Sequence, residues 1–560
     1  MKRILSIAAL SALVLGVLAA PAGATNFDPT VHLVRNAAPG SAPSAPANGI
    51  TYKSHLLYTA SDGTHGTELW TSDGTTVGTK LLKDIFKGSD SSNPTSLTLF
   101  KGKVYFAAKG STDGLSSAAG SELWVTDGTA AGTKLAEDVN PGFISSGPDL
   151  LTVAGGLLFF TAQDFTNGDE LWRTDGTDSG TFRVSQVKPG GASAGITYVE
   201  PVGSKVVFNG EDPADGRELF SSDGTVAHTG ILRDLNVGIG NSNPTSLTVS
   251  GTHVFFDATD GSHGLEAFVT DGTFLGTGMI KDISNTVDST PVGFTAYSGG
   301  VLFRASTSAA GNELWTSDGT SQGTTLVADI NPGTESGYPT GFTAFKGSMY
   351  FSASTAAGGQ ELWVTRGTLA TTHLVKDIDP GAIGSGVDGL MTAGPLLLFR
   401  ASSGTSGVEL WQSNGTSAGT KRVRDIYAGS PSGEPVQLGV IGNTALMAAT
   451  DASHGRELWA YTTRASTTKG YPKSHYSKST DKHHKIYLTV KVRATSTTPS
   501  GKVVLKSGSH IIGSGTLHSG NDKIRITKKL GKGTHHIRAY YYGGLNAQTS
   551  HSSYITIKVK

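Results

Sequence analysis

The chain has 560 residues, more than one ordinary hydrophobic core organises, so several structural units are expected. Glycine supplies 75 residues and charged residues only 16%, a composition that suits short strands with tight turns and excludes helical and disordered proteins. The net charge is zero, yet residues 25–463 carry −18 and residues 464–560 carry +16, which predicts two domains with different surfaces. There is no cysteine, which excludes disulfides and thiolate metal sites.

The first 24 residues have the pattern of a secretion signal. Lys2 and Arg3 precede an apolar run over residues 4–18, and small residues at 22–24 form a cleavage site. We expect cleavage after Ala24. The mature protein is then expected to be secreted and extracellular, either free or associated with the cell surface. The alternative is a membrane anchor, but the apolar run is short for a bilayer span, and no later stretch is long enough.

A Glu-Leu-Trp triplet or a softer copy of it occurs nine times. Successive Glu residues are separated by 54, 48, 48, 48, 47, 48, 48 and 48 residues. A fixed period of this length indicates a repeat architecture. The nine copies begin at Glu68, Glu122, Glu170, Glu218, Glu266, Glu313, Glu361, Glu409 and Glu457.

Each repeat predicts four short strands. In one copy, residues 96–100 alternate like a strand, residues 101–102 form a turn, and residues 104–108 form a second strand. The Glu-Leu-Trp strand, an Asp-Gly hairpin turn and a fourth strand at 134–139 follow. Four strands in about 48 residues without helical periodicity are typical of a propeller blade. The fold class is therefore all-β, with a propeller of nine blades over residues 25–463; eight blades plus a capping unit is the alternative.

The first and last parts of the propeller are expected to complete one blade together. The ninth unit contains no fourth strand after residues 457–461, whereas residues 31–36 look like a fourth strand without a blade. Pairing these segments would remove the open sheet edges, so we expect residues 31–36 to be the outermost strand of the last blade.

The repeats closely resemble the bacterial ELWxxDGT repeat family. The resemblance rests on the triplets and on Asp-Gly-Thr turns, and it covers about 430 residues. It implies a secreted or surface propeller-like module and no defined reaction. Two copies depart from the Asp, at Arg366 and Asn414, and the ninth lacks the turn. The turns begin at Asp73, Asp127, Asp175, Asp223, Asp271 and Asp318.

The C-terminal part predicts a second all-β domain. Residues 464–484 are polar and basic and are expected to be a linker, and residues 485–560 contain six or seven alternating strands, as in a β-sandwich. The run from Gly533 to Gly544 resembles the penultimate strand of bacterial Ig-like repeat domains. The acidic residue that usually follows this strand in the family is absent here, where Leu545 and Asn546 stand.

The repeated polar residues are interpreted as structural. Nine equivalent Glu residues argue against catalysis, since an active site breaks repeat symmetry, and we expect them to bind loop backbone. The Asp of each turn is expected to cap the turn rather than to bind calcium. His65, His263 and His454 lie in loops of separate blades, so they are interpreted as solvated and not as zinc ligands. We predict no catalytic residue, no metal site and no cofactor.

A basic cluster in the second domain is the candidate binding site. The hypothesis is a non-enzymatic adhesion protein, with the propeller as a recognition disc and the basic domain as a tether to an anionic polysaccharide or cell-wall polymer. No sequence-specific nucleic-acid reader motif is present. The alternatives are a secreted propeller enzyme acting on polysaccharide, a structural spacer, and docking of the basic domain on its own acidic propeller. The cluster comprises Lys523, Arg525, Lys528, Lys529, Lys532 and Arg538.

The two faces of the propeller are expected to differ. Short uniform turns at Asp-Gly-Thr and at residues 101–102 must share one face, because they alternate with longer loops along up-and-down strands. The longer loops, such as 109–121 and 140–148, vary between copies and are free to carry recognition. We therefore expect a propeller ligand on the long-loop face.

Overall fold

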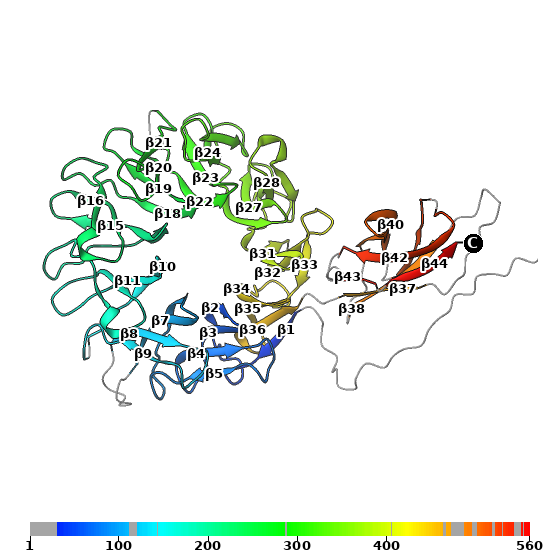
Figure 1. The fold of residues 1–560 in the computed structure, drawn as a ribbon, viewed down its shortest axis with the longest axis horizontal. Coiled ribbons are helices and arrows are strands. Elements are labelled where there is room, and N and C mark those ends of the chain that lie inside the picture. The colour runs from blue at the N-terminus through cyan, green and yellow to red at the C-terminus, as the bar shows by residue number, and fades with distance from the viewer. Residues whose placement is uncertain are drawn as a thin grey trace, which may run out of the picture.

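The computed structural model contains nine four-stranded antiparallel sheets arranged as a ring (Figure 1). It describes residues 31–559 apart from 111–119, 143, 286–287, 405, 463–465, 472–486, 495–500, 518–520, 529, 543–549 and 553. Each sheet is one blade, and the prediction of an all-β propeller with nine blades is confirmed for this part of the chain. Three short 3-10 helices occur among the described residues: η1 (Asp178–Gly180), η2 (Val226–His228) and η3 (Leu369–Thr371).

The two inner strands of each blade follow one another along the chain. The innermost strands, blade by blade, are β2 (Ala47–Tyr52), β6 (Thr95–Phe100), β10 (Asp149–Ala154), β14 (Val199–Val202), β18 (Thr245–Ser250), β22 (Val292–Tyr297), β26 (Thr340–Phe345), β30 (Asp388–Ala393) and β34 (Val436–Ile441). The second strands are β3 (His55–Ser61), β7 (Lys103–Lys109), β11 (Leu157–Ala162), β15 (Lys205–Asp212), β19 (His253–Thr259), β23 (Gly300–Thr307), β27 (Ser348–Thr355), β31 (Leu396–Ser403) and β35 (Thr444–Asp451).

The third strand of each blade carries the Glu-Leu-Trp triplet, and the fourth forms the rim. The third strands are β4 (Thr67–Ser72), β8 (Ser121–Thr126), β12 (Glu170–Thr174), β16 (Gly216–Ser222), β20 (Leu265–Thr270), β24 (Gly311–Ser317), β28 (Gly359–Thr365), β32 (Ser406–Ser413) and β36 (Gly455–Thr462). The rim strands are β5 (Lys80–Lys83), β9 (Lys134–Glu137), β13 (Phe182–Arg183), β17 (Gly230–Arg233), β21 (Gly278–Lys281), β25 (Thr325–Ala328), β29 (His373–Lys376), β33 (Lys421–Arg424) and β1 (Val31–Arg35).

Strand β1 closes the ring. It pairs antiparallel with β36, with Val31 opposite Tyr461, in a sheet of order β1-β36-β35-β34. This confirms the prediction that the first described strand completes the last blade. Arg424 of the preceding blade donates a hydrogen bond to the Val31 carbonyl at 2.7 Å, as Lys376 does to the Thr420 carbonyl at 2.8 Å. The closing strand is therefore held by β36 of its own blade and by Arg424 on the rim strand of the preceding blade.

The repeated Glu residues tie each blade to the segment that leaves it. The Glu68 carboxylate accepts hydrogen bonds from the backbone N–H of Ile85 at 2.8 Å and of Ser92 at 2.8 Å, and from the Ser92 hydroxyl at 2.6 Å. All nine of these Glu residues are at most 4% exposed. Glu457 accepts the same kind of bonds from the backbone N–H of Ala37 and Ser44, at 3.0 Å each. The expected backbone-binding role is confirmed, and at the ninth copy it also serves ring closure.

Apolar side chains fill the space between neighbouring blades. Trp315 packs with Phe303 of its own blade and with Phe255 and Ile283 of the preceding blade, and the other blade pairs are joined in the same way. At the inner strands, threonine hydroxyls add hydrogen bonds across the seam, as from Thr152 to the Val199 carbonyl at 2.8 Å. Stacking thus buries both faces of a blade that could not fold alone.

The predicted burial of the tryptophans holds for most copies. Trp70, Trp124, Trp315, Trp411 and Trp459 are buried, whereas Trp172 and Trp363 are half-buried. The two partly exposed rings still pack against the clusters that join their blades to a neighbour. The indoles therefore serve blade packing, and they are not a row of exposed sugar-stacking rings.

The C-terminal domain is built from two sheets. One has the order β37-β38-β41, formed by β37 (Ser466–Tyr471), β38 (Tyr487–Ala494) and β41 (Asn521–Arg525). We call it the three-stranded sheet. The other, the five-stranded sheet, contains β39 (Gly501–Ser507), β40 (His510–Leu517), β42 (Gly533–Tyr541), β43 (Ser550–His551) and β44 (Ile555–Val559). One cluster of buried side chains lies between them.

Strand β37 changes the expected domain boundary. Residues 466–471 fall within the range expected to be a linker, but they pair along their whole length with β38. The sequence did not indicate this strand, because the segment is polar and Ser466 to Lys469 show no alternation of apolar and polar residues. The sandwich thus begins before residue 485.

Replacing Trp315 by alanine should lower the free energy of unfolding by about 3–5 kcal/mol, because a cavity would open between two blades. Urea unfolding measures the loss. The half-buried Trp363 provides the comparison, and Trp363→Ala should cost clearly less. Equal losses at both positions would contradict the role assigned to burial between blades.

The stability should also depend on pH through the buried Glu residues. Burial raises the pKa of Glu68 and of Glu313 to about 7, although hydrogen-bond donors act in the opposite direction. A carboxyl with a raised folded-state pKa binds more protons when folded, so the free energy of unfolding falls as the pH rises from about 4.5 to about 7. We expect the melting temperature to fall over this interval.

The double variant Glu68→Gln/Glu313→Gln isolates this effect, because glutamine does not titrate. Its melting temperature should be lower overall, since the Gln amide donates where backbone donors point, and it should change less with pH. The hydrogen bond that the His65 ring donates to the Asp62 carboxylate raises the pKa of His65, which changes stability in the same direction and is retained in the variant. An unchanged pH dependence in the variant would show that other groups cause it.

Candidate polyanion-binding surface

The Asp of the Asp-Gly-Thr turn is used within its own turn. Asp73 Oδ1 accepts hydrogen bonds from the Thr75 N–H at 2.9 Å and from the Thr75 hydroxyl at 2.7 Å. These bonds, the hydroxyl bond foremost, lower the pKa of Asp73. Asn414, which replaces the Asp in one copy, accepts the same two bonds from Thr416. Because an uncharged amide does the same work, the geometry is that of turn capping.

The three repeated histidines each pair with an Asp of their own loop. Nδ1 of His65 lies 2.8 Å from Asp62, and His263 and His454 make the equivalent contacts with Asp260 and Asp451 at 2.8 and 2.9 Å. Each pair belongs to a different blade, so the three do not converge on one point. Within the described ranges, no group of three or more His, Asp or Glu side chains is placed to hold a metal ion.

The six basic residues predicted from the sequence do not all lie together. Arg525 is exposed between buried Ile524 and Ile526 on the three-stranded sheet, and Arg538 lies between buried Ile537 and Ala539 on the five-stranded sheet. All four apolar neighbours belong to the one core between the sheets. Side chains alternate along a strand, so the two arginines lie on opposite outer faces of the sandwich.

Three of the other four predicted residues lie on or near β41. Lys523 is on that strand, whereas Lys528 and Lys532 are exposed in the connection between β41 and β42. Lys529 lies outside the described residues. The sequence cluster therefore divides into a group at β41 and the connection, and Arg538 on the other sheet.

Arg538 belongs to a surface of cations and aromatic rings, which we call the cation–aromatic face. Its guanidinium carbon is 4.3 Å from the ring centre of Tyr554, and its strand partner Lys506 places Nζ 4.9 Å from the ring centre of Tyr540. The rings of His536 and His551 approach the two tyrosines edge-on, at 6.3 and 5.8 Å. Cation–π contacts hold the basic groups in place at little further entropic cost when a ligand binds.

The cation–aromatic face has no acidic counterpart in its sheet. The five strands that form the sheet contain no Asp or Glu. Tyr554 is 59% exposed, so one side of its ring is available to a ligand. Cations without an acidic residue in their sheet, beside an exposed ring, suit a ligand with anionic groups and flat apolar faces, as in an acidic polysaccharide.

Sequence reasoning missed Lys506, Tyr540 and Tyr554 as members of this surface. They lie on three separate segments, and the grouping by proximity along the chain favoured residues 523–538. The alternation of β42 was a usable signal, because it puts His536, Arg538 and Tyr540 on one face.

Among the described residues, no helix has the length and apolar character needed to cross a bilayer.

Several solved structures resemble the chain, with low TM-scores and low sequence identity. A puromycin hydrolase shares 11% identity with a TM-score of 0.34 over 74% of this chain, which spans 60% of that protein's length. The β-propeller domain of the Trilobed protease from Pyrococcus furiosus shares 12% identity at a TM-score of 0.32, over 68% of this chain and 97% of that domain. Sqt1 from Saccharomyces cerevisiae shares 12% identity at a TM-score of 0.35, with the same coverage. No functional residue is transferred from these proteins.

No curated protein matches the sequence of this chain. A family match covers the C-terminal part, including β38 to β44 and the cation–aromatic face. The nine blades lie outside the matched range. Residues 475–560 match the family of bacterial Ig-like domains, group 3, as the sequence pattern indicated.

Proposed function

We propose that this protein is a secreted or cell-surface adhesion protein that binds without catalysing a reaction. The propeller is its recognition module, and the Ig-like domain tethers it to an anionic surface polymer. The observation that carries this proposal is the cation–aromatic face, where Lys506 and Arg538 are supported by tyrosine rings and have no acidic residue in their sheet.

The charge distribution supports different binding roles for the propeller and the Ig-like domain. The part of the chain after residue 463 carries +16, whereas the propeller range carries −18. An anionic polymer is attracted to the Ig-like domain and repelled by most of the propeller. Such a polymer would leave the propeller free for another ligand.

The carboxylates of the repeats support a non-catalytic role. The nine buried Glu residues are engaged by backbone donors, and the Asp residues of the turns are engaged by threonines. The buried Glu residues are inaccessible to a ligand, and an oxygen of each turn Asp accepts hydrogen bonds within its own turn. We therefore assign a structural role to the repeated Glu and Asp residues.

The test is binding of the full chain to immobilised polyglycerol phosphate, measured by surface plasmon resonance at several salt concentrations. Lys506→Ala/Arg538→Ala should weaken binding about 30-fold, at roughly 1 kcal/mol for each cation next to an anionic surface. Wild-type affinity should fall as salt rises. Tyr554→Ala should weaken binding with a smaller change in the salt dependence, because it removes a ring and no charge.

Arg525→Ala/Lys528→Ala is the matched control, since it removes two exposed cations from the same domain and leaves the cation–aromatic face intact. It should retain most of the affinity. The proposal is wrong if the wild type does not bind, or if this control loses binding while Lys506→Ala/Arg538→Ala keeps it.

A further inference from the structure

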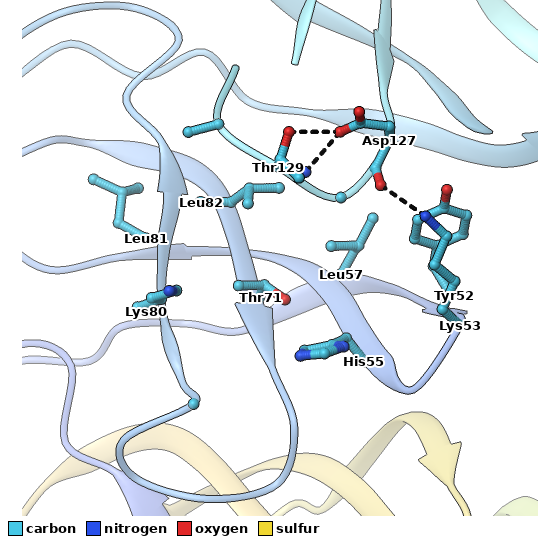
Figure 2. Close-up of a pocket in the computed structure, with 13 residues that line it drawn as sticks. Tyr52, Lys53, His55, Leu57, Thr71, Lys80, Leu81, Leu82, Asp127 and Thr129 are labelled. Atoms are coloured by element: carbon cyan, nitrogen blue, oxygen red, sulfur yellow. Dashed lines mark hydrogen bonds between the residues drawn. The ribbon is translucent and has the colours of Figure 1, made fainter. Parts of the chain in front are cut away.

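A groove lies between the first two blades on the face of the short turns. Its volume is about 610 Å³, and Leu57, Leu81 and Leu82 form an apolar floor. Figure 2 shows His55 and Lys80 on one side of the groove and the Asp127 turn of the next blade on the other. Lys53 reaches from the first blade toward that turn, and its Nζ donates a hydrogen bond to the Asp127 carbonyl at 3.2 Å.

The groove carries a net positive charge because Lys53 and Lys80 outnumber its one carboxylate, Asp127. Asp127 Oδ1 accepts hydrogen bonds from the N–H and the hydroxyl of Thr129, at 2.9 and 2.7 Å. Lys53, His55 and Lys80 are exposed, and none of them forms an ion pair among the described residues. The second blade repeats the arrangement, with Lys101 Nζ bonded to the Asp175 carbonyl at 2.8 Å.

The repeat shows that these basic residues are not required by the fold. Only the first two blades have Lys or His at all three positions, as Lys53, His55 and Lys80 in the first and Lys101, Lys103 and Lys134 in the second. The residues equivalent to Lys53 in blades three to nine are Gly155, Gly203, Gly251, Ser298, Lys346, Gly394 and Gly442. Those equivalent to His55 are Leu157, Lys205, His253, Gly300, Ser348, Leu396 and Thr444, and those equivalent to Lys80 in blades three to eight are Phe182, Gly230, Gly278, Thr325, His373 and Lys421.

The backbone at the first of these positions favours glycine. Lys53 has φ +54° and Lys101 has φ +45°, in the left-handed region where a side chain is strained, and five of the nine blades carry Gly there. Lys346 of the seventh blade has the same conformation, with φ +51°, so the first two blades are distinguished by a lysine here together with two further basic residues.

We propose that the six residues Lys53, His55, Lys80, Lys101, Lys103 and Lys134, here called the basic strip, bind an acidic polysaccharide. This proposal rests on the propeller being the recognition module, and it names the ligand class of that module. All six side chains are exposed, and they follow one another on adjacent blades within a domain that is otherwise acidic. The carboxylates of successive sugars pair with the two sets of cations.

The groove suits a sugar better than a nucleic-acid base. Its floor is aliphatic, and pyranose rings have apolar C–H faces that pack on such a floor. Tyr52, the tyrosine that lines it, is 5% exposed, and its hydroxyl donates to the Gly102 carbonyl. Its ring is thus not free to stack on a base, which leaves the His55 imidazole alone for the stacking that single-strand binding requires.

The basic strip lies on the short-turn face, whereas the sequence led us to expect a ligand on the long-loop face. The inner turn at Lys53 and the Asp127 turn meet there, while the His65 loop contacts the segment at Ser91 on the other side, where the Thr67 N–H donates to the Ser91 hydroxyl. These turns share their length but not their residues, and the first two blades alone combine three basic residues at the three positions. That combination is what marks the site.

The test uses the full chain carrying Lys506→Ala/Arg538→Ala, so that the cation–aromatic face does not contribute. Binding of hexagalacturonate is measured by isothermal titration calorimetry, with maltohexaose as the neutral sugar and a dT10 oligonucleotide as the nucleic acid. Hexagalacturonate should bind and maltohexaose should not. Adding Lys53→Gly/Lys101→Gly should lower the affinity for hexagalacturonate at least tenfold.

Lys346→Gly is the matched control. Lys346 has φ +51°, lies 4.7 Å from the ring centre of Phe345 and donates to the Asn414 carbonyl at 3.1 Å, so it reproduces the setting of Lys53 and Lys101 on a blade outside the basic strip. It should leave the affinity unchanged, and its melting temperature should shift about half as much as that of the double glycine variant.

Three outcomes would overturn the proposal: no binding of hexagalacturonate, an unchanged affinity in the double glycine variant, or tighter binding of dT10 with the same dependence on Lys53 and Lys101. None of them bears on the tether, which is measured separately with polyglycerol phosphate. Loss of the tether would likewise leave this experiment intact, because the cation–aromatic face is already disabled in it.

Discussion

The propeller depends on a buried carboxylate that recurs in every blade. The Glu of the third strand accepts hydrogen bonds from two places on the segment that leads to the next blade, 17 and 24 residues further along in the first copy. A hydrogen bond to a charged group contributes about 1.5–3 kcal/mol, and removing the acceptor leaves buried donors without a partner. The loop that leaves each blade is thereby held, which fixes where the next blade begins.

The same interaction makes the ring close. At the ninth copy no following blade exists, and the donors to Glu457 come from the segment just after β1. Strand pairing, the Arg424 bond and this carboxylate all act on residues 31–44, so the first segment of the propeller repeats the contacts of an ordinary connection. Ring closure therefore needs no additional type of interaction, because residues 31–44 make the same contacts to the ninth blade that the fourth strand and the following segment make to the other blades.

A symmetric scaffold makes departures from symmetry informative. Where all nine copies share a residue, as with the buried Glu, the fold explains it. Exposed Lys or His at all three positions occurs in two adjacent copies alone, so the fold does not require this combination, and the lysines at positive φ are even unfavourable for the turn. The Ig-like domain offers no such internal comparison, so its cation–aromatic face is identified from contacts and from the lack of acidic residues in its sheet.

The sequence by itself determined the repeat, the four strands of a blade, the closing strand and the second all-β domain, because period, alternation and turn residues are local properties. The role of the Glu could also be inferred, since nine identical copies do not make one active site. The tertiary structure decided which distant residues meet. It separated Arg525 from Arg538, because the two sheets face opposite ways around one core, and it joined Arg538 to Tyr554 and Lys506. It also revealed the strand at residues 466–471 and the groove between blades, which depend on pairing and packing across the fold rather than on neighbours in the chain.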